Sequence, residues 1–116
     1  EIEEAVSRLK REGYISEERF AEVFIRSRLR KLPEGKALLA MRLRERGCAE
    51  DAARKALSEA WERKDYMEPL ISYMDELTRK KGEEKAYAAL MHKGFSPTEV
   101  RRARAMLSER AVDELE

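Results

Sequence analysis

The 116-residue sequence is poor in the residues that most fold classes and catalytic sites depend on. It has five glycines and three prolines, fewer than the many turns of a β-sandwich or β-barrel require. One cysteine, Cys48, cannot form an internal disulfide, and with the one histidine, His92, it cannot supply the four ligands of a structural zinc site. No apolar stretch approaches the roughly 18 residues of a membrane-spanning helix. These absences exclude disulfide scaffolds, zinc modules, all-β folds and membrane spans.

Patterns typical of enzymes are missing as well. The sequence has neither a glycine-rich phosphate loop nor a dinucleotide-binding fingerprint, and its carboxylates alternate with basic residues. Cys48 and His92 each lie near a helix-ending glycine of a different unit, which disfavours a nucleophile pair. We expect Cys48 to be a small buried residue and His92 to interact with the last carbonyls of its helix. We therefore expect no enzyme activity, no cofactor, no metal and no small-molecule substrate.

The balance of charge also excludes one way of binding nucleic acid. The chain has 25 Lys and Arg against 24 Asp and Glu, and a net charge of +1 excludes a polycation that holds nucleic acid by bulk charge. No charged and then apolar leader is visible, and a lone cysteine suits a reducing compartment. The chain begins at Glu1 within a helical pattern, and we interpret it as a fragment whose beginning is missing.

What the sequence does contain is helical periodicity, because apolar residues recur at spacings of three and four almost throughout. Ser16 and Ser96 are suited to cap helices, while Pro33 and Pro97 fit the first turns of others. We predict an all-α fold, an elongated array of about seven helices. The expected ranges are 2–12, 16–31, 33–46, 49–64, 65–80, 83–92 and 96–110.

A Leu-x-x-x-Gly pattern repeats along the chain, at 9–13, 43–47 and 90–94. The second and third glycines are 47 residues apart, close to the length of a three-helix repeat. We therefore predict the last helix of a truncated repeat at 1–13 and whole three-helix repeats at 14–64 and 65–110. A frayed acidic tail is expected at 111–116. Stacked helical repeats usually present extended surfaces that bind other macromolecules.

Large apolar side chains mark the expected core. Phe20, Phe24 and Trp61 lie on apolar helical stripes, so we expect all three to be largely buried. Tyr14 and Phe95 follow two of the repeated glycines, and we expect them to pin one helix to the next.

Basic residues gather in clusters, while acidic residues concentrate near 1–4, 17–18 and 109–116. Arg19, Arg26 and Arg30 share one stripe of the helix expected at 16–31. Lys36 and Arg42 extend this cluster on the next helix. We predict that these five residues bind an anionic partner. The alternative is a solvated helix face with an internal Glu–Arg pair.

Two further sets of basic residues have different expected roles. Arg28 lies four residues from both Phe24 and Leu32, on the apolar side of its helix. We expect it at a helix interface with Phe20, Phe24 and Trp61, either paired or with its charge reaching water. A possible second basic surface is formed by Arg101, Arg102 and Arg104.

Three runs of residues resemble those of a known family. Glu18-Arg19-Phe20-Ala21-Glu22-Val23-Phe24-Ile25-Arg26-Ser27-Arg28 resembles the signature helix of the RecX family of recombinase regulators. Leu43-Arg44-Glu45-Arg46-Gly47 followed by Ala56-Leu57, and then Lys93-Gly94-Phe95-Ser96, are similar to two later landmarks of that family. The link at 31–35 departs from the family's glycine-rich basic link, which ends in Gly-Pro, because here Pro33 precedes Gly35 and an acid, Glu34, is inserted between them.

The resemblance covers about residues 2–107 and implies tandem three-helix repeats. It also implies a cytoplasmic bacterial protein that binds the RecA filament, together with the single-stranded DNA within it. Such a protein usually suppresses strand exchange and ATP hydrolysis by RecA, and so acts in DNA repair and the SOS response. The alternative function is a helix-turn-helix-like DNA-binding domain, with Arg101, Arg102 and Arg104 on its recognition helix.

Overall fold

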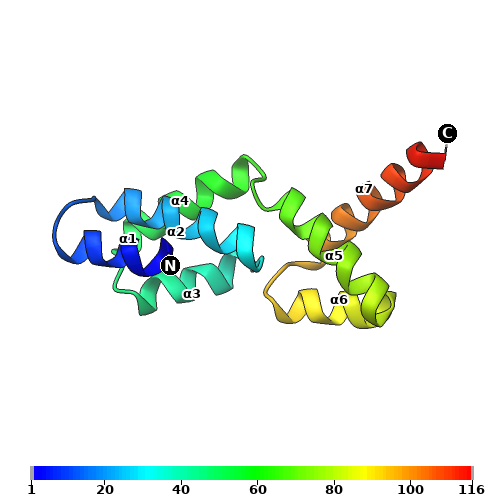
Figure 1. Cartoon of the computed structure of the whole chain (residues 1–116), viewed down its shortest axis with the longest axis horizontal. Coiled ribbons are helices and arrows are strands. Elements are labelled where there is room, and N and C mark those ends of the chain that lie inside the picture. The colour runs from blue at the N-terminus through cyan, green and yellow to red at the C-terminus, as the bar shows by residue number, and fades with distance from the viewer. Residues whose placement is uncertain (1, 116) are drawn as a thin grey trace.

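A computed structural model describes residues 2–115 as helices joined by short links, and no strand occurs in that range (Figure 1). The all-α fold class is therefore confirmed, and the molecule is elongated, with extents of 52 × 26 × 25 Å. No helix within the described range is long and apolar enough to cross a membrane. The helices are α1 (Ile2–Arg11), α2 (Glu17–Lys31), α3 (Lys36–Glu45), α4 (Glu50–Glu62), α5 (Met67–Lys81), α6 (Glu83–His92) and α7 (Pro97–Leu115).

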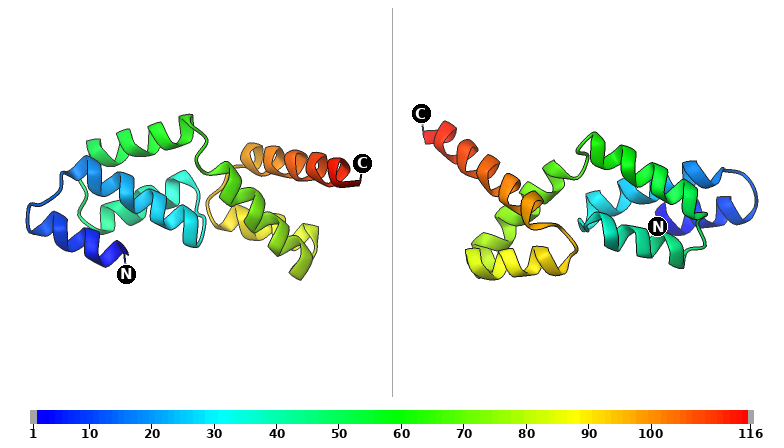
Figure 2. Two further views of the ribbon diagram at one scale, coloured as in Figure 1. Left: turned by 45° about the horizontal axis from the view of Figure 1, so that its top comes forward. Right: turned by 180° about the vertical axis from the view of Figure 1, so that it is seen from behind.

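The helices pack in two groups that follow one another along the long axis (Figure 1). In the first group α2 packs against α1 and α4, and α3 packs against α4. In the second group α5 packs against both α6 and α7. The C-terminal part of α7 projects away from the rest of the molecule, as the two further views in Figure 2 also show.

The first group is built around α2 because this helix carries apolar residues over a wide face. Phe20 and Phe24 are fully buried, with ring centroids 5.8 Å apart. Small side chains on α4 allow its backbone to approach α2 closely. They are the buried residues Ala52, Ala53, Ala56 and Ala60.

The Leu-x-x-x-Gly pattern corresponds to one type of helix end. At the end of α6 the N–H of Gly94 donates to the carbonyl of Met91 (3.0 Å), and the N–H of Phe95 donates to that of Leu90 (3.2 Å). This is the Schellman motif, and Gly94 adopts the positive φ of 91° that the motif requires. The ends of α1 and α3 have the same two bonds. The end of α4 has them too, but Lys64 takes the glycine position at φ 60°.

Both predicted serine caps are present. The Ser16 hydroxyl accepts a hydrogen bond from the backbone N–H of Arg19 at the start of α2 (3.1 Å). At the start of α7 the Ser96 hydroxyl accepts from the N–H of Glu99 (3.1 Å). The Glu99 carboxylate accepts from the N–H of Ser96 (2.9 Å). This reciprocal pair is a capping box, which fixes where α7 begins.

The two groups of helices meet in a direct backbone contact. The N–H of Gly35 donates to the carbonyl of Lys93 (2.8 Å). A Cβ atom at Gly35 would lie 1.9 Å from the carbonyl oxygen of Gly94, so only glycine permits this approach. Beside it, the indole N–H of Trp61 donates to Glu99 (2.6 Å), which joins the end of α4 to the start of α7.

Two expected boundaries are corrected by the structure. Pro33 lies in the link before α3 and not in its first turn, because the chain stays extended through Gly35 while the Glu34 side chain turns inward. The tail expected to fray from 111 continues α7 to Leu115, with exposed side chains. An ion pair between Arg110 and Glu68 of α5 holds the helix just before this tail. Glu116 lies outside the described residues.

Two expected aromatic positions are corrected as well. Tyr14 is 74% exposed and pins nothing, whereas Phe95 is buried as expected. Trp61 is half-buried at the edge of the core, where its indole N–H reaches Glu99. Its ring stacks on Tyr66, with ring centroids 4.7 Å apart, and Tyr66 is the more deeply buried of the two.

Candidate functional site

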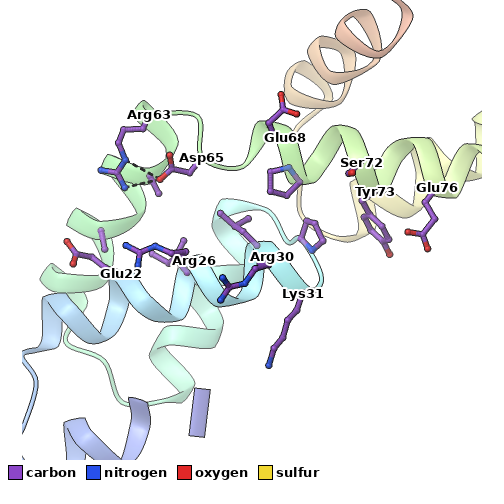
Figure 3. Close-up of a pocket in the computed structure, with 16 residues that line it drawn as sticks. Glu22, Arg26, Arg30, Lys31, Arg63, Asp65, Glu68, Ser72, Tyr73 and Glu76 are labelled. Carbon is purple, nitrogen blue, oxygen red and sulfur yellow. Dashed lines mark hydrogen bonds and ion pairs between the residues drawn. The ribbon is translucent and has the colours of Figure 1, made fainter. Parts of the chain in front are cut away.

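A groove of about 960 Å³ lies between α2 and α5 and is also lined by α4 (Figure 3). Arg26 and Arg30 stand on consecutive turns of α2 at one wall, and Ser72 and Tyr73 of α5 stand at the other. The apolar part of the lining consists of Ile25, Leu29, Pro33, Ala56, Ala60 and Pro69. Half of the sixteen lining residues are charged, four acidic and four basic, and most of the apolar ones are buried, so charged groups dominate the groove.

The carboxylates that line this groove are already paired with cations. The pairs are Glu22–Arg19 (3.4 Å), Asp65–Arg63 (2.9 Å), Glu76–Lys80 (2.9 Å) and Glu68–Arg110. Hydrogen bonds from Arg110 hold the pKa of Glu68 below its ordinary value, so this carboxylate is ionised at neutral pH. Arg26 and Arg30 are exposed and make no ion pair within residues 2–115. Positive charge is thus available in the groove at these two arginines.

The five residues expected to bind a partner do not share one surface. Arg26 and Arg30 line the groove, and Arg19 is exposed about two turns before Arg26 on the same helix, where it pairs with Glu22. Lys36 is exposed but lines a second groove, between α3, α4 and the start of α7. Arg42 turns toward Glu34 and is bound by it. The single basic face expected from helical spacing is therefore divided by the fold.

Glu34 is a structural residue that the sequence analysis did not identify. Its side chain is fully buried, and both its oxygens accept hydrogen bonds from Arg42 at 2.8–3.1 Å. Arg28 donates to the same carboxylate (3.2 Å) and also pairs with Glu3 of α1 (3.3 Å). Glu3 is approached by Arg46 as well (3.6 Å). This cluster ties α1, α2, the 32–35 link and α3 together.

The charge state of Glu34 follows from its surroundings. Burial alone would raise the pKa of Glu34, but hydrogen bonds and charge from Arg42 and Arg28 outweigh that effect and lower it. Glu34 is therefore ionised at neutral pH. The guanidinium of Arg42 is bound to it and stabilises the fold. The only sequence sign of this role was an isolated acid between Pro33 and Gly35, after an arginine-rich helix.

The three arginines of α7 are exposed and have different neighbours. Arg104 forms an ion pair with Glu83 of α6, and Arg101 lies within 3.4 Å of the Thr98 hydroxyl. Arg102 lines a separate hollow between α5 and α7. These placements give the helix-turn-helix interpretation no support from geometry.

Cys48 and His92 have different surroundings. The Cys48 sulfur lies 3.6 Å from the carbonyl oxygen of Ala49 and 3.9 Å from that of Glu17. Burial raises the pKa of the Cys48 thiol to about 11, and the charge of Glu17 adds to the shift. The thiol is therefore protonated at neutral pH, which makes it a poor nucleophile.

His92 is exposed in the last turn of α6. Among the residues described, no group of His, Cys, Asp or Glu is arranged to hold a metal ion.

Comparison with known proteins gives consistent matches. A family model that describes the second three-helix domain of RecX matches residues 16–57. The regulatory protein RecX of Treponema pallidum is 30% identical over 111 residues, which cover 95% of this chain and 68% of that protein. No solved structure gives a significant match.

Two longer relatives carry the same name. The regulatory protein RecX of Oceanobacillus iheyensis is 32% identical over 100 residues, which cover 81% of this chain and 37% of that protein. The one of Streptococcus uberis is 27% identical over 99 residues, which cover 82% of this chain and 38% of that protein. This chain thus spans well under half the length of these two relatives.

Proposed function

We propose that this chain, which belongs to the RecX family, binds the RecA filament. By binding, it inhibits the strand-exchange and ATPase activities of RecA. The partners of the chain are the RecA filament and the single-stranded DNA within it. Through them the chain regulates DNA repair and the SOS response in the cytoplasm. The chain acts by binding and not by catalysis. The names of the relatives, which are regulatory proteins, support this assignment.

Arg26 and Arg30 support a binding role for the groove between α2 and α5. They lie in the stretch that the RecX family model matches, and they line the groove without an ion pair among residues 2–115. An exposed guanidinium suits a carboxylate or phosphate, which it binds through two parallel hydrogen bonds. A chain lodged on the filament by this groove blocks filament growth or promotes disassembly.

We also propose that 14–64 and 65–110 are successive repeats of one three-helix unit. The two groups of helices and the repeated Schellman ends support this division. Repeats joined through the Gly35–Lys93 contact give the elongated shape that a filament groove accommodates.

Co-sedimentation with RecA filaments tests the proposal directly. The chain is mixed with RecA on single-stranded DNA and centrifuged, with RecA omitted in the control. We expect the chain in the pellet with RecA and in the supernatant without it. Pelleting with DNA alone, and a steep loss of that binding with salt, would instead indicate a direct nucleic-acid binder.

A further inference from the structure

We propose that the groove between α2 and α5 closes on itself. At low ionic strength the two groups of helices move together, and Arg26 and Arg30 of α2 pair with carboxylates on the opposite side of the groove. This closure is a property of the chain alone and goes beyond the proposed function. It follows from the separation of charges in the groove, the acceptors that its carboxylates keep, and the few connections between its walls.

Opposite charges lie on opposite walls of the groove (Figure 3). The lining residues of α2 comprise three cations and one carboxylate, a net charge of +2. Among the described residues, those of α5 that line the groove comprise two carboxylates, Glu68 and Glu76, and no cation, a net charge of −2. Most of the apolar lining residues are already buried, so they give a partner little surface to cover. The two walls are therefore complementary to each other.

Two of the carboxylates that line the groove keep room for a second donor. Lys80 donates to Oε1 of Glu76 (2.9 Å), which leaves Oε2 for another hydrogen bond. The side chains of Glu76 and Lys80 are 53% and 67% exposed, so this pair is weak and can be shared. Asp65, in the link between α4 and α5, is bound by Arg63 through Oδ2. Each carboxylate can thus accept an arginine of α2 and keep its present partner.

Arg26 and Arg30 are free to make this contact. Both are exposed, and neither forms an ion pair within residues 2–115. Across the open groove their attraction to the carboxylates is weak, because salt screens it. The screening length is about 30 Å at an ionic strength of about 0.01 M and about 3 Å at about 1 M. A guanidinium that reaches a carboxylate binds it more strongly, through two parallel hydrogen bonds. Closure is therefore favoured at low ionic strength and lost at high ionic strength.

Few connections hold the two walls at their present separation. The chain passes from one group of helices to the other through the link at 63–66. The groups also meet at the backbone contact of Gly35 with Lys93 and at the hydrogen bond from Trp61 to Glu99. Within residues 2–115, direct contact between α2 and α5 is slight at most. Groups of helices joined at so few points can rotate relative to one another, and this rotation narrows or widens the groove.

Closure affects partner binding, and this consequence rests on the proposed function. Arg26 and Arg30 are the residues proposed to contact the RecA filament, so the closed form withholds them from that partner. The filament then binds the open form, and the observed affinity falls in proportion to the fraction of the chain that is open. The groove thus limits its own availability.

Zero-length cross-linking with a carbodiimide tests closure on the whole chain without RecA. The reagent joins a lysine amine to a carboxylate in contact with it. The variants Arg26→Lys and Arg30→Lys are therefore made singly, and each keeps the charge at its site. Mass spectrometry of the monomer fraction then locates the amide bonds. The reference is the pair of Lys10 and Glu17 (3.3 Å), which joins α1 to α2 and does not line the groove.

At an ionic strength of about 0.01 M we expect the lysine introduced by Arg30→Lys to be joined to Glu76, and that of Arg26→Lys to Asp65. Relative to the reference, the yield of both links should fall at least about threefold at about 1 M. The control Arg8→Lys, the same change on an exposed residue of α1, should give neither link. The proposal is overturned if neither link forms at low ionic strength while the reference link does. It is also overturned if the relative yields are the same at both ionic strengths.

The outcome also separates closure from the proposed function. If the links form but RecA does not retain the chain, closure stands and the proposed function fails. If RecA retains the chain and no link forms, the proposed function stands and closure is wrong. Where both hold, Glu76→Gln should lower the amount of chain needed for half-inhibition of RecA about twofold at low ionic strength, because less of the chain is closed. The control Glu62→Gln changes an exposed residue of α4 outside the groove and should behave like the parent. Equal half-inhibition by the parent and Glu76→Gln would show that closure does not withhold the arginines.

Discussion

Replacing Glu34 with alanine removes the carboxylate that Arg28 and Arg42 share, and the cost can be worked out from its surroundings. Glu34 is fully buried, while the side chains of Arg28 and Arg42 are 21% and 35% exposed. Removing one partner of a buried ion pair typically costs about 3–5 kcal/mol. Because both arginines can turn partly toward water, we expect a loss near the lower end, about 3 kcal/mol. That is a large share of the roughly 5–15 kcal/mol by which domains are stable.

Urea unfolding followed by circular dichroism measures this loss. With a slope of about 2 kcal/mol per molar urea, typical of small proteins, we expect Glu34→Ala to lower the midpoint by about 1.5 M. Glu34→Gln keeps the shape and one acceptor, so we expect a smaller decrease. The matched control is Glu76→Ala, which removes an exposed i, i+4 pair with Lys80 and is expected to cost less than about 1 kcal/mol.

The contribution of Glu34 also depends on pH, with a definite sign. The folded protein holds the pKa of Glu34 below its ordinary value, so the unfolded chain binds this proton more readily. The stabilisation is complete above the unfolded pKa of about 4.3 and is lost as the pH falls through the folded pKa. We therefore expect the difference in free energy of unfolding between the parent and Glu34→Gln to shrink as the pH falls below the unfolded pKa of about 4.3. A Glu34→Ala variant within about 1 kcal/mol of the parent, or a pH-independent difference, would refute the assigned role.

Three further predictions address the core, the junction and the absence of chemistry. Phe24→Ala should cost about 3–5 kcal/mol in urea unfolding, because the ring is fully buried, and a nearly unchanged midpoint would contradict this packing. Gly35→Ala should separate the two groups of helices, since its Cβ would lie 1.9 Å from the Gly94 carbonyl oxygen. Small-angle scattering should then give a larger radius of gyration at unchanged helix content, and an unchanged radius would argue against the junction. Cys48→Ser and His92→Ala should each leave inhibition of RecA ATPase activity intact, and a folded, RecA-binding variant without inhibition would require a chemical role.

The helices were predictable because their signals are local. The period of apolar residues, the Ser16 and Ser96 caps and the Leu-x-x-x-Gly endings each act within one or two turns. The end of α4 carried no such signal, because Lys64 adopts the positive φ that glycine takes elsewhere. The acidic composition of 111–116 suggested fraying, whereas α7 continues to Leu115.

The candidate site was only partly predictable, because helical spacing gives the face of a residue but not what lies opposite. Arg26, Arg30 and Arg42 carry the same charge, and the sequence distinguished them only by position. The fold places Glu34 against Arg42 and leaves the other two unpaired among the described residues. Contacts between helices therefore decide which arginines remain unpaired. Glu34, which pairs with Arg42, lies in a link, and a link has no periodic sequence pattern from which its inward direction could be predicted.

Titration of RecA's DNA-dependent ATPase activity with this chain tests the central claim most directly, because the claim assigns inhibition to Arg26 and Arg30. The parent chain is compared with Arg26→Glu/Arg30→Glu and with the control Arg8→Glu/Arg11→Glu at moderate salt. We predict that the groove variant keeps its helix content but needs at least about tenfold more protein for half-inhibition, while the control behaves like the parent. Equal inhibition by the parent and the groove variant would contradict the account.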